Sequence, residues 1–205
     1  VVVGVFDTGI DPTHPDFFDA NGKTRILKLW DMSSKSSSGA PEGYDWGKEY
    51  TKADIDNDIT SVSAIDAQGH GTHVAGTAAG SGMADANFRG VAYGSDLIIV
   101  KGVRDDNDET GFTDADLIAG CSYIIAEAKK LNKPVVINLS LGDIIGSHDG
   151  KDLLALALSG LVERGAIIVA ATGNEGEMPI HSGGAVAADT RVEFPIYTVM
   201  NLCNY

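Results

Sequence analysis

Short apolar runs, rich in valine, isoleucine and leucine, recur along the chain and are separated by polar or glycine-rich segments. Several of these runs are continuously apolar rather than alternating, which is typical of strands in a parallel sheet that is covered on both faces. The pattern therefore predicts strands at residues 1–6, 26–30, 97–100, 135–139, 167–171 and 194–200.

Helical periodicity fills the stretches between the later strands. Thr113 is a suitable N-cap with Asp116 three residues on, and the pattern continues to about Leu131. A second helix is expected to open at Asp149 and to end at Gly165. Strands that alternate with helices predict right-handed crossovers and an α/β fold, namely a doubly wound, mostly parallel sheet with helices on both faces. The apolar face of the first helix is expected to hold Leu117, Ile118, Cys121, Ile124, Ile125 and Ala128.

Residues 33–64 interrupt this alternation. The segment is rich in serine, glycine, aspartate and lysine and has no sustained period, so we expect an irregular insertion on the surface. The 205 residues otherwise fit one large domain, and a composition of 43% hydrophobic and 21% charged residues is ordinary for a globular protein.

The chain is acidic, with 29 acidic and 15 basic residues and a formal charge of −14. We therefore expect neither nucleic acid nor an anionic membrane surface as a partner, because both are bound through a cationic footprint. No apolar run approaches the ~20 residues that a membrane-spanning helix requires. Of the two cysteines, Cys121 lies in the apolar helical pattern and is expected to be buried, while a bridge between Cys121 and Cys203 stays open.

Candidate chemistry gathers where predicted strands end, which is the edge at which open α/β sheets bind their ligands. Asp7 directly follows the first strand, and Gly9 behind it allows a tight turn that would fix the carboxylate; such an aspartate also commonly caps a turn. His70 opens the segment His-Gly-Thr-His-Val-Ala-Gly-Thr, whose small residues predict a closely packed helix. The alternatives for His70 are a satisfied interfacial histidine or a metal ligand with His73, but the latter lacks the His-Glu-x-x-His pattern of zinc peptidases.

Two further strand ends carry polar or glycine residues. The strand at 135–139 continues into Ser140, Leu141 and Gly142, a rim that offers backbone groups to an extended peptide. The strand at 167–171 is followed by Asn174 between glycines at 173 and 176. An asparagine there either adopts a left-handed turn or presents its side-chain amide to the same cleft.

Together these segments resemble the subtilisin-like (subtilase) family of serine peptidases. The resemblance rests on Asp-Thr-Gly at 7–9, the motif at 70–77, Asn-Leu-Ser-Leu-Gly at 138–142 and Ala-Ala-Thr-Gly-Asn-Glu-Gly at 170–176, in that order. It implies that Asp7 orients the imidazole of a catalytic triad, that His70 is the general base, and that Asn174 donates to the oxyanion.

The resemblance also implies how a substrate is held and which partners to expect. Ser140, Leu141 and Gly142 match the strand that pairs with substrate backbone, and the region around Gly111 matches the opposite edge. A peptide or protein substrate, a pro-segment, and a secreted or cell-surface location follow from the family. Asp16 matches a common calcium-ligand position, but a turn carboxylate is the favoured interpretation, and no cofactor or metal is expected.

The nucleophile of the family is missing from this sequence. It lies on a Gly-Thr-Ser-x-Ala segment well after the oxyanion asparagine, whereas only 31 residues follow Asn174 and none of them form it. Ser182 comes too early and is interpreted as a loop residue. We therefore expect 1–205 to be part of a peptidase domain whose C-terminal portion carries the serine, so that the chain alone is inactive. The main alternative is a catalytically dead homologue that binds peptides or a pro-segment. A nucleotide-binding module would need a phosphate-binding glycine motif that is absent.

Overall fold

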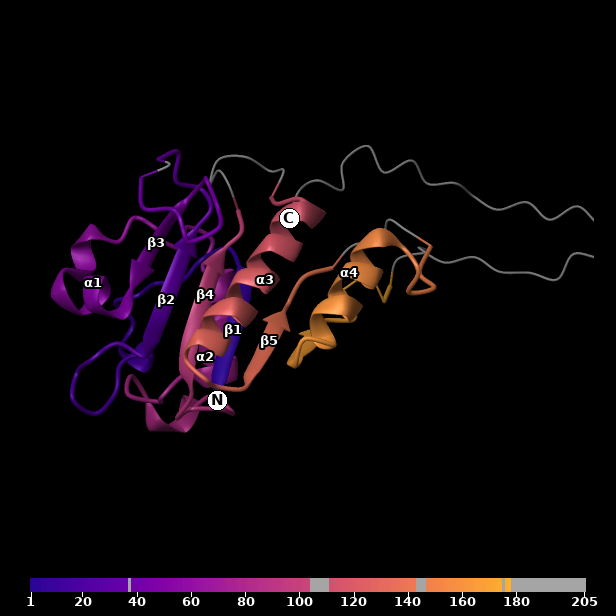
Figure 1. The fold of residues 1–205 in the computed structure, drawn as a ribbon. Helices are drawn as coiled ribbons and strands as arrows, with labels where there is room; N and C mark the ends of the chain where they lie inside the picture. Colours follow the sequence, from indigo (N-terminus) through magenta and orange to yellow (C-terminus); the bar gives the residue numbers. More distant parts are fainter. Residues whose placement is uncertain (37, 104–110, 143–146, 175, 178–205) are drawn as a thin grey trace, which may run out of the picture.

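A six-stranded sheet forms the centre of the computed structural model, which describes residues 1–36, 38–103, 111–142, 147–174 and 176–177 (Figure 1). The strands lie in the order β3-β2-β4-β1-β5-β6, and every neighbouring pair is parallel except β2 with β3. This arrangement confirms the expected α/β fold with a mostly parallel sheet. The strands are β1 (Val2–Asp7), β2 (Ile26–Asp31), β3 (Lys48–Thr51), β4 (Asp96–Lys101), β5 (Val135–Leu139) and β6 (Ala166–Ala170).

Five of the six predicted strands appear within one or two residues of their expected bounds, and the sixth, at 194–200, lies outside the described residues. Burial departs from expectation at β6, where Ile167 is 60% and Val169 51% exposed among the described residues. Unlike the central strands, β6 thus leaves apolar side chains exposed within the part of the chain that the structure describes.

The predicted helix N-termini are confirmed in one case and corrected in another. In α3 (Asp114–Lys130), Thr113 and Asp116 form the expected capping box. The helix α4 (Leu153–Val162) starts later than predicted: Asp152 caps it by accepting from the backbone N–H of Ala155, at 2.8 Å. Asp149 instead closes the preceding turn by accepting from Ser147 and Lys151.

Helices cover both faces of the sheet and create two separate cores. On one face, α3 and α4 pack over the sheet, as Figure 1 shows. On the other face lie α1 (Lys52–Asn57) and α2 (His70–Ala79). Cys121 belongs to the first core and is fully buried, and this burial raises the pKa of its thiol to about 12. Cys203 lies outside the described residues.

The segment 33–64 is not irregular throughout, which corrects the expectation from its composition. It contains β3, α1 and a short 3-10 turn, Ile59–Ser61. Tyr50 and Ile55 are each only 2% exposed, so the segment contributes to the core beneath it. A capping box between Thr51 and Asp54 starts α1. The regular pieces are four and six residues long, too short to leave a period in the sequence.

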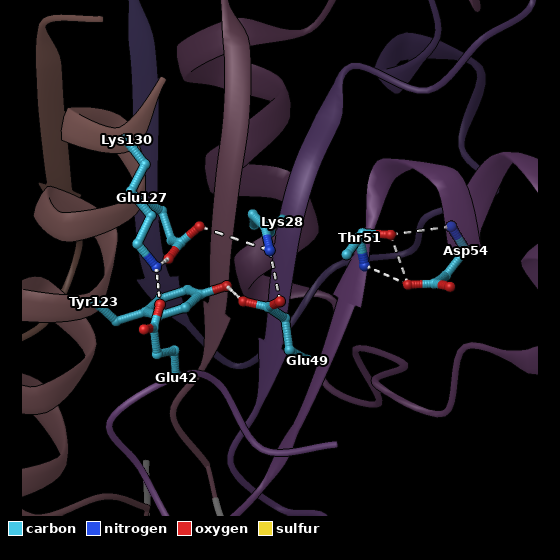
Figure 2. A network of polar contacts seen from close by, with 8 residues as sticks. All are labelled: Lys28, Glu42, Glu49, Thr51, Asp54, Tyr123, Glu127 and Lys130. Atoms are coloured by element: carbon cyan, nitrogen blue, oxygen red, sulfur yellow. Dashed lines mark hydrogen bonds and ion pairs between the residues drawn. The ribbon is translucent and has the colours of Figure 1, made fainter. Parts of the chain in front are cut away.

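A polar network joins β2 and β3 to α3 at the edge of the sheet (Figure 2). The Tyr123 hydroxyl donates to Glu49 Oε2 at 2.7 Å, and Lys28 Nζ lies 2.5 Å from Glu49 Oε1 and 3.6 Å from Glu127 Oε2. Lys130 extends the network to Glu127 and Glu42. Burial, together with the neighbouring Glu49 charge, raises the pKa of Tyr123, so its hydroxyl stays a donor. The network thereby fixes β3 against the helix layer.

An aromatic cluster fills the same corner of the molecule. The Trp30 ring lies with its centroid 4.4 Å from that of Tyr44, 5.4 Å from that of Trp46 and 5.1 Å from that of Tyr123. Tyr44 also donates from its hydroxyl to the carbonyl of Ala119 in α3. Rings contributed by β2, α3 and the segment before β3 thus hold the first half of the chain to the first core.

Candidate active site

Two residues that the sequence separates widely meet at the carboxyl end of β1. Asp7 ends this strand, and Gly9, at φ 129°, turns the chain in a way that favours glycine. His70 is the first residue of α2, entered from Gly69 at φ 78°. The His70 Nδ1 and Asp7 Oδ1 atoms are 2.7 Å apart, a hydrogen bond. The predicted pairing of Asp7 with His70 is therefore present in the structure.

The two side chains of the pair differ in their exposure to solvent. The Asp7 side chain is fully buried, whereas that of His70 is 52% exposed. An ionised carboxylate can only accept, so the neutral ring holds its proton on Nδ1 and has an unprotonated Nε2. Asp7 Oδ1 also accepts from the backbone N–H of Thr8 at 2.8 Å. The arrangement is therefore an imidazole that is held at Nδ1 by a buried carboxylate and belongs to a half-exposed side chain.

Gly71 allows α2 to approach β1 closely enough for this bond. A Cβ atom at position 71 would lie 2.3 Å from the carbonyl oxygen of Gly9 and 3.1 Å from Asp7 Cβ. The first distance is far inside ordinary contact and involves a backbone atom, and the second is tight. The glycine after His70 thus sets the separation between the helix and the strand end.

The loops after β5 and β6 lie side by side at the same edge of the sheet. A Cβ at Gly142 would be 3.7 Å from the Cα of Gly173, one residue before Asn174. Because β5 neighbours β1, parallel pairing brings this rim toward the carboxyl end that bears Asp7. Asn138 Nδ2 donates to Ser140 Oγ at 2.9 Å, and Leu141 is partly buried against the core. Ser140 and Leu141 are thereby fixed, and Gly142 and Asn174 are exposed.

Gly111 lies just before the N-cap of α3, at φ 62°. The next residue, Phe112, packs its ring edge-on against Phe6, with centroids 4.9 Å apart, so this loop is fastened beside the residue that precedes Asp7. The preceding residues 104–110, which include the acidic run Asp105–Glu109, and Ser182 lie outside the described residues.

Sequence reasoning did not identify three polar residues that shape this region. Asp66 and the buried Lys101 hold the segment that leads into His70, and Arg25 holds the loop that follows α2. Arg25 and Lys101 donate mostly to backbone carbonyls distant in sequence, and Asp66 accepts from the Thr8 hydroxyl 58 positions away, so no motif marks these residues. The one available signal for Asp66 is its place four residues before His70, in a stretch without helical or strand period.

Two oxygens of Asp16 take part in hydrogen bonds within the chain. Its Oδ1 accepts from the N–H of Ala84 at 2.9 Å, and its carbonyl accepts from Arg25 Nη2 at 2.6 Å. The 8% exposed Arg25 also donates to carbonyls of Ala79, Ser95 and Tyr93 at 2.5, 2.7 and 2.9 Å. The Arg25 guanidinium thus bonds four backbone carbonyl oxygens, one of which is that of Asp16. Within the described part of the chain, no group of three or more acidic, histidine or cysteine side chains is placed to hold a metal.

Replacing Arg25 by methionine is expected to lower the free energy of unfolding by about 3 kcal/mol, because four backbone carbonyls lose a charged donor. Arg89→Met is the matched control, since Arg89 is exposed, donates once, to Ser81, and stacks on Tyr93. The Arg89→Met substitution is expected to lower the free energy of unfolding by less than about 1 kcal/mol. Urea unfolding measures both, and equal losses would contradict the role assigned to Arg25.

Known proteins share both the sequence pattern and this architecture. A model described as the Subtilase family matches residues 1–196. Curated relatives include a subtilisin of Bacillus sp. (strain TA39), 32% identical over 85% of this chain, and the subtilisin-like protease SBT1.3 of Arabidopsis thaliana, 30% identical over 88%. The major intracellular serine protease of Bacillus subtilis (strain 168) is 32% identical over 86% of the chain.

Solved structures agree with these relatives. The CspB protease of Clostridium perfringens superposes with a TM-score of 0.75 at 36% identity, covering 86% of this chain and 36% of its own. The S41 psychrophilic protease gives a TM-score of 0.61 at 29% identity, covering 85% of this chain and 46% of its own.

The chain spans only part of the proteins it matches: 34%, 24% and 44% of the length of the three curated relatives. No helix among the described residues combines the length and apolar character needed to cross a membrane.

Proposed function

Because the chain belongs to the subtilase family of serine peptidases, we propose that it forms part of the catalytic domain of a serine endopeptidase. In this proposal Asp7 orients and stabilises the imidazole, His70 is the general base and then acid, and Asn174 donates to the oxyanion. The serine nucleophile comes from a segment outside the 205 residues. The observation that carries the proposal is the 2.7 Å bond between buried Asp7 and half-exposed His70.

The proposed reaction uses each group in turn. The serine hydroxyl attacks the scissile carbonyl and passes its proton to His70 Nε2, while the Asp7 carboxylate stabilises the resulting imidazolium through Nδ1–H. The side-chain amide of Asn174 donates to the oxyanion of the tetrahedral intermediate. Collapse breaks the peptide bond as His70 returns the proton to the leaving amine. Water then hydrolyses the acyl-enzyme by the same steps in reverse.

Substrate binding is proposed along the rim after β5. The residues Ser140 to Gly142 continue a strand beyond its last ladder pair, and a backbone in that position pairs with an extended peptide by strand addition. Gly111 is proposed to border the other side. A pro-segment would use the same rim, because it is itself a peptide.

The missing nucleophile determines what this chain does by itself. Neither a Gly-Thr-Ser segment nor an equivalent occurs in the sequence, and the curated relatives are more than twice as long as the matched region. A base and an oxyanion donor without a nucleophile form no acyl-enzyme. We therefore propose that residues 1–205 alone do not hydrolyse peptides. Secretion stays a prediction, since one relative is named as an intracellular protease.

A fluorophosphonate probe tests the proposal. The full-length protein that contains this chain is expected to be labelled at a serine within a Gly-Thr-Ser segment, and residues 1–205 alone are expected to stay unlabelled. Labelling of the 205-residue chain at Ser182 would overturn the assignment of the nucleophile. A full-length protein that binds peptides but takes no label would instead support the catalytically dead homologue.

A further inference from the structure

The segment that leads into α2 is tied down by one carboxylate, that of Asp66, which accepts four hydrogen bonds. Oδ1 accepts from the Thr8 hydroxyl at 2.7 Å and from the Gly69 N–H at 2.9 Å. Oδ2 accepts from the N–H and the hydroxyl of Thr72 at 2.8 and 2.7 Å. Both oxygens therefore accept two hydrogen bonds each, and every donor lies within two residues of Asp7 or His70.

These bonds belong to a closed circuit between the turn after β1 and the first turn of α2. The Thr8 hydroxyl, while donating to Asp66, accepts from the Gly71 N–H at 2.9 Å. The Thr72 hydroxyl likewise accepts from the Asp11 N–H at 2.9 Å. Thr8 directly follows Asp7, and Gly71 directly follows His70. The circuit thus fixes the neighbours of both residues relative to each other.

Charge strengthens the circuit. Burial alone would raise the pKa of Asp66, but hydrogen bonds from Thr72, Thr8 and Gly69 outweigh it and lower the pKa below its ordinary value. The side chain is therefore ionised at neutral pH, and its bonds are charge-assisted. The same segment has a second anchor, since the buried ammonium of Lys101 donates to the carbonyl of Ile65 at 2.8 Å.

We propose that Asp66 is a positioning residue for the reaction: it holds His70 Nδ1 within hydrogen-bond distance of Asp7 by fastening the two chain segments that carry them. The inference rests on the proposed function, because it assigns His70 the task of general base. Asp66 itself touches neither substrate nor the imidazole. Asp66 affects only the alignment of the base. A substitution of Asp66 is therefore expected to change kcat rather than substrate binding.

Asp66→Ala and Asp66→Asn in the full-length protein test the proposal. Both are expected to lower kcat about 100-fold while KM changes by less than about threefold, because misalignment affects the chemical step. Asparagine fails for a specific reason: its NH2 group would face two of the four donors. Asp58→Ala and Asp58→Asn are the matched controls, since Asp58 accepts from the N–H and hydroxyl of Thr60 in the same way but contacts no part of the site. Their kcat is expected to stay within about twofold of the parent.

Thr8→Val and Thr8→Ser separate alignment from folding. Valine has the shape of threonine but removes the donor to Asp66 and the acceptor for Gly71, whereas serine keeps both. The proposal requires serine to restore the kcat that valine loses. Unchanged kcat in both Asp66 variants and in Thr8→Val would overturn it.

A spectroscopic measurement keeps this test independent of the proposed activity. The Nδ1–H proton of His70, held between nitrogen and carboxylate, gives a downfield proton resonance. This resonance is expected to broaden or vanish in the Asp66 variants and to persist in the Asp58 variants. If the parent protein shows the resonance but hydrolyses no peptide, the proposed function fails while the role of Asp66 is still decided by the resonance. A resonance unchanged by Asp66→Ala would refute the positioning role.

Discussion

Replacing Asp7 by asparagine in the full-length protein is expected to lower kcat by about 10⁴-fold, the loss that this kind of change causes in serine peptidases of another fold. An amide supplies no negative charge to stabilise the imidazolium. Where its NH2 group faces Nδ1, it also forces the ring proton onto Nε2, which removes the base. The side chains have the same shape, so the fold is expected to persist.

Hydrolysis of a peptide substrate measures this loss, and circular dichroism checks the fold. Asp19→Asn is the control, because Asp19 accepts from the N–H groups of Asn21 and Lys23 in an exposed turn and lies outside the site. A loss below about tenfold in Asp7→Asn would show that the paired carboxylate does not serve the base in the way proposed.

Gly71→Ala is expected to damage both stability and activity. The added Cβ would lie 2.3 Å from the Gly9 carbonyl oxygen, a backbone atom in a tight turn that has little freedom to move. Relieving the overlap requires α2 to shift away from β1, which lengthens the Asp7–His70 bond. We expect the free energy of unfolding to fall by about 2–3 kcal/mol, as for overpacked cores, and kcat/KM by at least about 100-fold.

The same helix provides the control. Gly76→Ala places its Cβ where no heavy atom lies within 4 Å, so it is expected to be neutral or to stabilise by up to about 1 kcal/mol through helix propensity. Urea unfolding and peptide hydrolysis distinguish the two positions. If the two alanine variants behave alike, the close approach of α2 and β1 is not what places His70.

Much of the fold was predictable because its signals are local. Apolar runs marked β1, β2, β4 and β5, although Lys28 interrupts the run in β2, and the Thr113–Asp116 pair marked the start of α3. The glycines of the motif were also interpretable from the sequence, because glycine is typical of positions where two backbone segments approach closely. Asp7 and His70 could be assigned as a pair only through the family resemblance, since 63 positions separate them.

The remaining features depend on distant partners. β3 is defined by its pairing with β2, and in the sequence four residues with a single buried side chain cannot be distinguished from a loop. The start of α4 was misplaced because Asp149 and Asp152 are equally good caps in sequence, and only the folded chain decides between them. Arg25 donates to backbone carbonyls up to 70 positions away, and Asp66 accepts from the Thr8 hydroxyl 58 positions away. No residue spacing in the sequence predicts either contact.

The aromatic corner has an optical consequence. Trp30 and Trp46 are the only two tryptophans of the chain, and they lie together between β2 and the segment before β3. The tryptophan fluorescence of this chain is therefore expected to report whether that segment is packed on α3. It is expected to be insensitive to small displacements around the His70 imidazole. A substitution that leaves emission untouched while hydrolysis collapses has acted locally, whereas a red-shifted spectrum reports that the corner has opened to water.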